Sequence, residues 1–293
     1  MIGYPITEAH LKQLIETEAP GWLLRAKERT KQFVAAGKYS ESSTIWSEVK
    51  AVYMRLQGES KCVYCERKLE AEERGKSEQD VEHFRPKGSV RAWQVPVPVQ
   101  QQGVSVTPPG AGAPGYHRLP YHLFNYSAAC KPCNSALKSD CFPIAGKYRF
   151  NGGNPRTLAA EKPLLIYPLG DFDADPEMLI RFHGVSPQPV AAAGHERHRA
   201  LATIAFFELD DPIQRKNLVR ERAVIITTLY PQLEVLAGAP GSKAAARQIV
   251  GGFTSAKAPH TNCARSYADL YGRDRPEALA IFERAAAFID ASS

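Results

Sequence analysis

Two short cysteine pairs constrain this chain more than any other feature: Cys62-Val-Tyr-Cys65 and Cys130-Lys-Pro-Cys133. A Cys-x-x-Cys turn directs two sulfurs toward one point, and two such turns can close a tetrahedron around zinc. The 64 residues between the pairs exceed the ~15–20 of a compact zinc finger. Lengthening the loop from ~16 to ~64 residues is two doublings, which add only about 1.2 kcal/mol of closure entropy. Structural zinc binding contributes far more, on the order of 10–16 kcal/mol. We therefore expect these four cysteines to hold a structural Zn²⁺.

Two other interpretations of the cysteine pairs remain open at this stage: a redox dithiol, as in a thiol oxidoreductase, or thiols buried as small hydrophobic groups. The redox interpretation is disfavoured because neither pair lies at a strand-to-helix junction of a βαβ unit. The two remaining cysteines, Cys141 and Cys263, have no partner at ligand spacing. We expect them to be buried or inert rather than ligands.

The composition is that of a globular protein, with 293 residues, 44% of them hydrophobic and 23% charged. No stretch approaches the roughly 18 apolar residues that a membrane span needs. The first residues show no basic flank ahead of an apolar core, so we expect a cytoplasmic protein without a secretory signal. Residues 61–150 carry 13 basic and 8 acidic side chains, most of the net charge of +6. This surplus suggests a polyanionic partner, although ordinary surface charge is the alternative.

The chain divides by pattern into three parts, which together predict an α+β fold. Residues 1–60 are expected to be helical, with an apolar stripe over 45–56. Residues 61–150 form a core that is interrupted at 92–115 by an uncharged stretch rich in Pro and Gly, expected to be a loop. Residues 151–293 begin with short β-like runs at 164–167 and 178–182 and are expected to be mostly helical from 195 onward.

Between and beside the cysteine pairs lie the residues that indicate a chemistry. They are Asp80-Val-Glu-His-Phe-Arg-Pro-Lys87, then Phe124-Asn125, then Cys130-x-x-Cys-Asn-x-x-Lys138. In this order, and over a span of 77 residues, the set resembles the zinc-stapled HNH endonucleases of the ββα-metal type. A looser likeness in Phe142-Pro143, residues 161–168 and Asp175-Pro-Glu177 is similar to the HNH proteins that accompany retron and Septu-type anti-phage systems. The resemblance implies a ββα-metal core between N- and C-terminal helical regions.

The resemblance also implies a reaction centre. Phosphodiester hydrolysis needs a base for the attacking water and positive charge at the leaving oxygen. His83 suits the base, because the intrinsic pKa of a histidine side chain is near neutrality. Glu82 and Asn134 would be the protein ligands of a catalytic Mg²⁺ or Mn²⁺ ion. Outside this frame, His83 would be an ordinary solvated or core histidine and Asn134 a helix cap.

The remaining positions of the motif are given supporting roles. Asn125 would orient the loop that carries the histidine, its alternative being a turn residue. The cations Arg85, Lys87 and Lys138 are candidates for contacts to the substrate phosphates, with ordinary surface charge as the alternative. Asp80 could compete as a metal ligand, but a residue three back along a strand is expected to point elsewhere.

The sequence departs from the family pattern at several positions. His122 stands where relatives often carry an acidic residue, and either His117 or His122 could be a substitute ligand or a phosphate contact. The carboxylate is Glu82 where many HNH enzymes have Asp. One further methylene shifts the position of the ion but keeps the chemistry feasible.

From these features we expect a metal-dependent HNH endonuclease that hydrolyses DNA, as the effector of a bacterial anti-phage system and with an ATPase as a possible partner. A restriction-type or RNA-directed HNH nuclease is the alternative within the same chemistry. A non-catalytic zinc module that binds nucleic acid or a partner is the alternative from another class. No membrane partner is expected.

Overall fold

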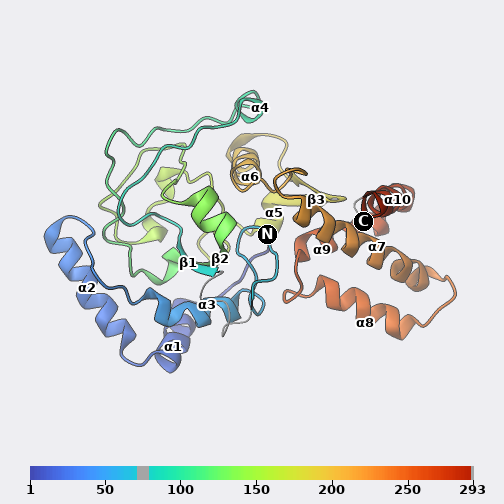
Figure 1. Cartoon of the computed structure of the whole chain (residues 1–293), viewed down its shortest axis with the longest axis horizontal. Helices are drawn as coiled ribbons and strands as arrows, with labels where there is room; N and C mark the ends of the chain where they lie inside the picture. Colours follow the sequence, from blue (N-terminus) through green and yellow to red (C-terminus); the bar gives the residue numbers. More distant parts are fainter. Residues whose placement is uncertain (71–78, 292–293) are drawn as a thin grey trace.

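The computed structural model describes residues 1–70 and 79–291. It combines helices with two small antiparallel sheets, and the mixed α+β class expected from the sequence is confirmed. In Figure 1 the N-terminal helices and the β1–β2 region form one lobe, and the last helices form a second lobe beside it. The helices of the first lobe are α1 (Glu8–Glu18), α2 (Trp22–Ala36), η1 (Trp46–Val49) and α3 (Lys50–Leu56).

The N-terminal helices begin and pack as their sequences dictate. Thr7 caps α1, its hydroxyl accepting a hydrogen bond from the His10 N–H at 3.2 Å. Leu11 and Ile15, one turn apart on α1, are completely buried. The apolar stripe expected over 45–56 is confirmed, because η1 and α3 together cover Trp46–Leu56.

The centre of the first lobe is a two-stranded sheet followed by a helical turn. Strands β1 (Gln79–His83) and β2 (Tyr126–Cys130) pair antiparallel, with His83 opposite Tyr126. The π-helix η3 (Pro132–Lys138) follows β2 directly. In its wide turn the Ser139 N–H bonds the Asn134 carbonyl oxygen, five residues back, at 2.6 Å.

The segment 92–115 is a loop, as expected, apart from the single turn α4 (Val97–Gln100). It is nevertheless attached to the fold. Val95 and Val104 are buried against Leu201 and Ala202 of α6 (Gly194–Phe206) in a small separate cluster.

One prediction of local structure is wrong. The run 164–167 is buried but forms no strand. The Leu164 N–H bonds the Pro143 carbonyl oxygen, and the Tyr167 N–H bonds the Asp173 carboxylate at 2.9 Å. Because loop groups take these donors, no ladder forms. The run 178–182 lies partly in the strand β3 (Ile180–His183), which pairs with β4 (Ser186–Pro189).

The region from residue 195 onward is helical, as expected. Asp274 caps the last helix by accepting from the Glu277 N–H at 3.1 Å. The elements not yet given are η2 (Leu123–Asn125), η4 (Pro155–Thr157), η5 (Ala159–Glu161), α5 (Pro176–Leu179), α7 (Lys216–Ala237), α8 (Lys243–Thr254), α9 (Thr261–Arg273) and α10 (Arg275–Asp290).

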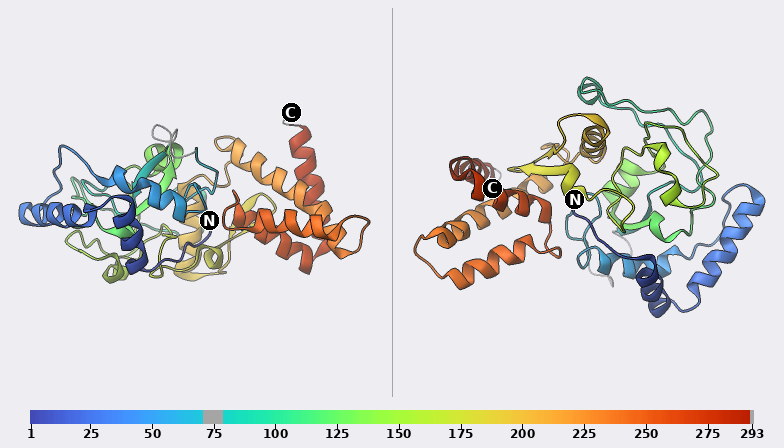
Figure 2. Two further views of the ribbon diagram at one scale, coloured as in Figure 1. Left: turned by 90° about the horizontal axis from the view of Figure 1, so that it is seen from below. Right: turned by 180° about the vertical axis from the view of Figure 1, so that it is seen from behind.

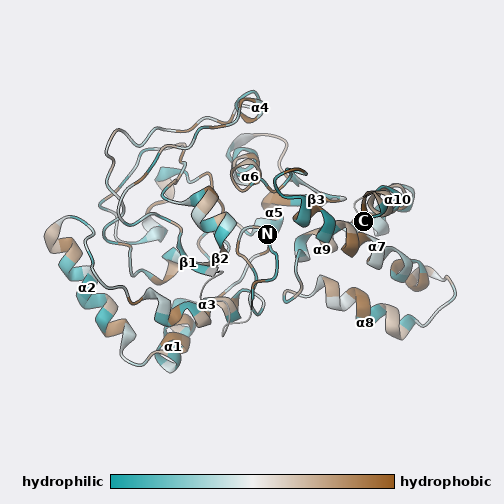
Figure 3. Ribbon diagram, in the orientation of Figure 1, coloured by the Kyte–Doolittle hydropathy of each residue, from teal (hydrophilic) through white to brown (hydrophobic). Residues whose placement is uncertain are grey.

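One continuous hydrophobic core runs through both lobes, from Met1 to Ala285. The N-terminus lies where the lobes meet (Figure 2). Figure 3 shows hydrophobic and hydrophilic residues alternating along the helices, which is typical of elements half-buried on such a core. Among the described residues, no helix has the length and hydropathy to span a membrane.

Candidate metal centre and active site

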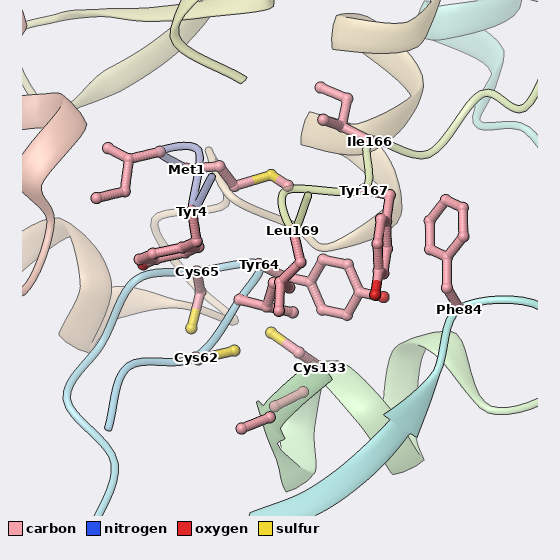
Figure 4. Packing of buried hydrophobic residues seen from close by; sticks show 14 of the residues in the cluster. Met1, Tyr4, Cys62, Tyr64, Cys65, Phe84, Cys133, Ile166, Tyr167 and Leu169 are labelled. Atoms are coloured by element: carbon pink, nitrogen blue, oxygen red, sulfur yellow. The ribbon is translucent and has the colours of Figure 1, made fainter. Parts of the chain in front are cut away.

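The four cysteines predicted as zinc ligands meet at one buried point. Their sulfur atoms all lie within 4.8 Å of one another. Cys62 and Cys65 come from the turn before β1, and Cys130 and Cys133 from the junction of β2 with η3. Figure 4 shows the sulfurs of Cys62, Cys65 and Cys133 pointing toward one another. Cys141 and Cys263 take no part in this cluster.

The spacing of the sulfurs fits zinc. Four sulfurs at about 2.3 Å from a tetrahedral ion lie about 3.8 Å from one another, and the Cys65 and Cys130 Sγ atoms are 3.8 Å apart. A disulfide would need about 2.05 Å. Four buried cysteines this close together could therefore bind a zinc ion. A search of the described His, Cys, Asp and Glu side chains for groups that could hold a metal ion finds these four cysteines.

The cysteine cluster also contacts the start of the second lobe. Arg215, just before α7, donates from Nη2 to the Cys133 Sγ at 3.4 Å and from Nη1 to the Phe207 carbonyl oxygen at 3.0 Å. Burial alone would lower the pKa of Arg215, but the neighbouring cysteine sulfurs raise it. A guanidinium in this place balances the negative charge that a four-thiolate zinc site carries.

Next to the cluster, the predicted reaction-centre residues line one polar pocket of about 270 Å³. Glu82 and His83 reach it from β1, Lys87 from the turn after β1, and Asn134 from η3. The structure therefore brings together residues up to 52 positions apart in the chain. Ser135, Ser139 and Asp140 complete its polar wall.

The His83 ring is fixed in one orientation. Its Nε2 lies 3.2 Å from the Pro120 carbonyl oxygen, and because a carbonyl can only accept, Nε2 carries the proton and Nδ1 holds the lone pair. The rings of Trp46 and Tyr126 contact it edge-on, with centroids at 4.9 and 5.1 Å. Burial, and next the charge of Lys87, hold the pKa of His83 well below its usual value. The imidazole is therefore neutral at pH 7.

Glu82 lies in a buried ion pair. Its Oε1 is 2.8 Å from the Lys138 ammonium and accepts a hydrogen bond from the Tyr64 hydroxyl at 3.3 Å. Burial raises the pKa of Glu82, while the Lys138 charge opposes that shift. Lys138 also donates to the His83 carbonyl oxygen at 3.0 Å, so one ammonium holds the backbone of the strand end and the carboxylate together.

The side chain of Asn134 is oriented by Asp80, which was expected from the sequence to point elsewhere. Its Nδ2 donates to the Asp80 carboxylate at 3.0 Å, and the Ser135 hydroxyl donates to the same oxygen. The expectation that Asp80 points elsewhere is wrong, because residues two apart on a strand share a face and Asp80 precedes Glu82 by two. With Nδ2 engaged, Oδ1 is the Asn134 atom that could coordinate a cation.

Asn125 is completely buried beneath the histidine loop. Its Oδ1 accepts from the Arg85 N–H at 2.8 Å, and its Nδ2 donates to the carbonyl oxygens of Arg85 and Leu119 at 3.0 and 3.1 Å. These three bonds tie the turn after His83 to the segment that carries Pro120. The side chain therefore lies where it can orient the loop.

Two of the three predicted phosphate contacts need correction. Lys138 is completely buried in its pair with Glu82, and Arg85 is 2% exposed, with its Nε 3.0 Å from the Glu161 carboxylate. A cation that is buried against its own carboxylate is not a surface contact for DNA. Lys87, in contrast, lines the pocket half-buried over the Trp46 ring, at 4.7 Å from its centroid. Burial lowers the pKa of Lys87.

His117 and His122 lie outside the polar pocket. The His122 Nδ1 accepts from the Phe124 N–H at 3.2 Å and so caps η2. Burial lowers the pKa of His122 to about 4. Neither histidine replaces a ligand of the pocket.

Asp140 lines the polar pocket but was not among the site residues predicted from the sequence. Asp140 stands two residues after the last position of the motif, and that proximity was the available signal. In comparisons with protein-family models, curated proteins and solved structures, nothing matches this chain.

Proposed function

We propose that this chain is a metal-dependent endonuclease of the HNH type, which hydrolyses phosphodiester bonds in DNA. The observation that carries the proposal is the polar pocket, where a neutral histidine, a carboxylate, an amide oxygen and a lysine come together beside the four-cysteine cluster. The paired strands β1 and β2, followed directly by η3, support the proposal because a ββα core has this order of elements.

In this proposal His83 is the general base. Its Nε2–H is engaged with the Pro120 carbonyl, so the proton of the attacking water passes to Nδ1. Trp46 and Tyr126 hold the ring against rotation while the proton moves. Lys87 lies in the same wall and attracts the negatively charged phosphate into the pocket.

The donor set suits a hard divalent cation. The carboxylate of Glu82 and the Oδ1 of Asn134 would hold it, because oxygen ligands are those that Mg²⁺ and Mn²⁺ prefer. Such an ion would stabilise the charge that develops on the phosphoryl and leaving oxygens. Lys138 and Asp80 keep the two protein groups in place.

Plasmid nicking tests the proposal. Purified protein should relax supercoiled plasmid with Mg²⁺ or Mn²⁺ and not with EDTA, and His83→Ala should lower the rate by 10²-fold or more, on the order of a lost general base. His198→Ala, a substitution on α6 away from the pocket, is the matched control. Equal rates for His83→Ala and wild type would contradict the assignment.

A second candidate function, a non-catalytic zinc module that binds nucleic acid, is favoured by one observation. Lys138 already neutralises Glu82, and a carboxylate that serves only an ion pair needs no catalytic metal. This candidate predicts DNA binding that is unchanged in the Glu82→Gln and His83→Ala variants, together with no ion-dependent nicking by the wild type.

The biological setting is part of the proposal, with defence against phage and an ATPase partner as the expected context. It is tested by plating phage on cells that carry the wild-type gene or His83→Ala within its native operon. Protection by the wild type alone supports the setting. Activity on RNA in place of DNA would favour the RNA-directed alternative.

A further inference from the structure

A second pocket is lined by the two residues that directly follow β1, Phe84 and Arg85. It has a volume of about 200 Å³ and shares no residue with the pocket of Glu82 and His83. Phe84 and Arg85 reach it from the end of β1, Arg156 from η4, and Arg199 from α6. Figure 1 shows α6 between the β1–β2 region and the last helices.

The wall of this second pocket is positively charged. Arg85, Arg156, Lys162 and Arg199 line it, against one lining carboxylate, Asp173. The partners of Arg85 and Arg156, which are Glu161 and Asp171, are not lining residues. Arg156 and Lys162 are the exposed cations of this wall, whereas Arg85 is buried in its ion pair with Glu161.

Two further features favour an anion. Helix α6 begins at this pocket, and its N-cap residue Ala193 provides no side-chain acceptor for the first-turn N–H groups. Arg199 is 8% exposed, and both of its terminal nitrogens bond Asp173, yet its Nε has no hydrogen-bond partner among the described residues.

His195 lies one turn before Arg199 on α6 and lines the same wall. Burial, and next the charges of Arg199 and Lys162, lower the pKa of His195.

From this arrangement we infer that the second pocket binds a phosphate monoester. Guanidinium groups match phosphate oxygens in geometry and charge, and the start of a helix adds N–H donors. The volume is below the roughly 300 Å³ at which pockets for drug-sized ligands begin, so it accommodates a phosphoryl group with part of a sugar rather than a whole dinucleotide. The rings of Phe84 and Phe172 provide the apolar part of the wall. The bound phosphate monoester would belong either to a 5′-phosphorylated strand end or to a free mononucleotide.

Calorimetric titration of the full-length zinc-loaded protein, at constant ionic strength, tests the inference. Thymidine 5′-phosphate should bind saturably and thymidine should not. A 5′-phosphorylated trinucleotide and its 5′-hydroxyl form, titrated into the His83→Ala variant, distinguish the sources. Preference for the phosphorylated trinucleotide assigns a strand end, and binding of the mononucleotide alone assigns a free nucleotide.

Two variants locate the binding. Lys162→Asn suits the backbone there, because Lys162 has φ +50° and asparagine tolerates that conformation. Arg156→Gln removes a cation that is exposed at the rim. Each should weaken binding on the order of tenfold, the loss of one charge-assisted hydrogen bond.

Lys147→Asn removes an exposed lysine outside the pocket and is the matched control. Absence of saturable binding, or equal weakening by Lys147→Asn and Lys162→Asn, would overturn the inference. Because no step requires cleavage, failure here leaves the proposed nuclease function untouched.

Discussion

Lys138→Met should destabilise the protein strongly, because it removes one partner of a buried ion pair. Lys138 is completely buried and Glu82 is 2% exposed, with 2.8 Å between Nζ and Oε1. Leaving one charge of such a pair unpaired costs about 3–5 kcal/mol. The substitution also leaves the His83 carbonyl oxygen without its donor. At roughly 2 °C per kcal/mol for a chain of this size, the melting temperature should fall by about 6–10 °C.

The paired variant tests the reasoning behind that number. Adding Glu82→Gln to Lys138→Met removes the unpaired charge, so the double variant should be more stable than Lys138→Met alone, with a coupling energy of a few kcal/mol. Differential scanning calorimetry of the four proteins measures it, with Lys131→Met, at an exposed lysine just before η3, as control. Additive losses, or a fall within about 1 kcal/mol for Lys138→Met, would refute the buried pair.

Three further predictions concern the metal, a histidine and the loop. Elemental analysis should find one zinc per chain, and Cys133→Ser should lose it and unfold at lower temperature; full occupancy in that variant would contradict the four-sulfur site. His122 has a pKa of about 4 in the folded protein and about 6.5 when unfolded, so stability is lost as pH falls from 6.5 toward 4, by up to ~3 kcal/mol. His122→Asn, which keeps an acceptor for η2, should flatten that part of the urea-measured profile, and an unchanged profile would refute the cause. Asn125→Ala removes three buried hydrogen bonds and should cost on the order of 3 kcal/mol in the same assay; a loss below about 1 kcal/mol would show that the loop is held otherwise.

The metal cluster and the pocket were accessible from sequence because each depends on short-range spacing. Two residues between cysteines place both sulfurs on one side of a turn, and adjacency of Glu82 to His83 places both at one strand end. The convergence of the two distant cysteine pairs was predictable from the expected zinc site, because one tetrahedral ion would require both pairs to meet.

Two of the corrections concern properties that residue spacing does not encode. Arg85 is buried by Glu161, 76 residues further along the chain, and nothing local distinguishes such a cation from one that meets DNA. The apolar run 164–167 has the composition of a strand, but strand formation needs a neighbouring backbone, and its N–H groups bond loop acceptors instead. The prediction for Asp80 was wrong for a simpler reason. Side chains two residues apart on a strand point to the same face, so the sequence alone was sufficient to place Asp80 beside Glu82.

The contact of Arg215 with Cys133 has a consequence for how this protein can be dissected. The guanidinium belongs to the C-terminal part of the chain, yet it serves a cluster built entirely by the earlier part. A fragment ending before Arg215 would keep the four sulfurs of the cluster but lose the guanidinium that contacts Cys133. Expression of the cysteine-bearing part alone should therefore yield a poor binder of zinc, and the chain is best handled whole.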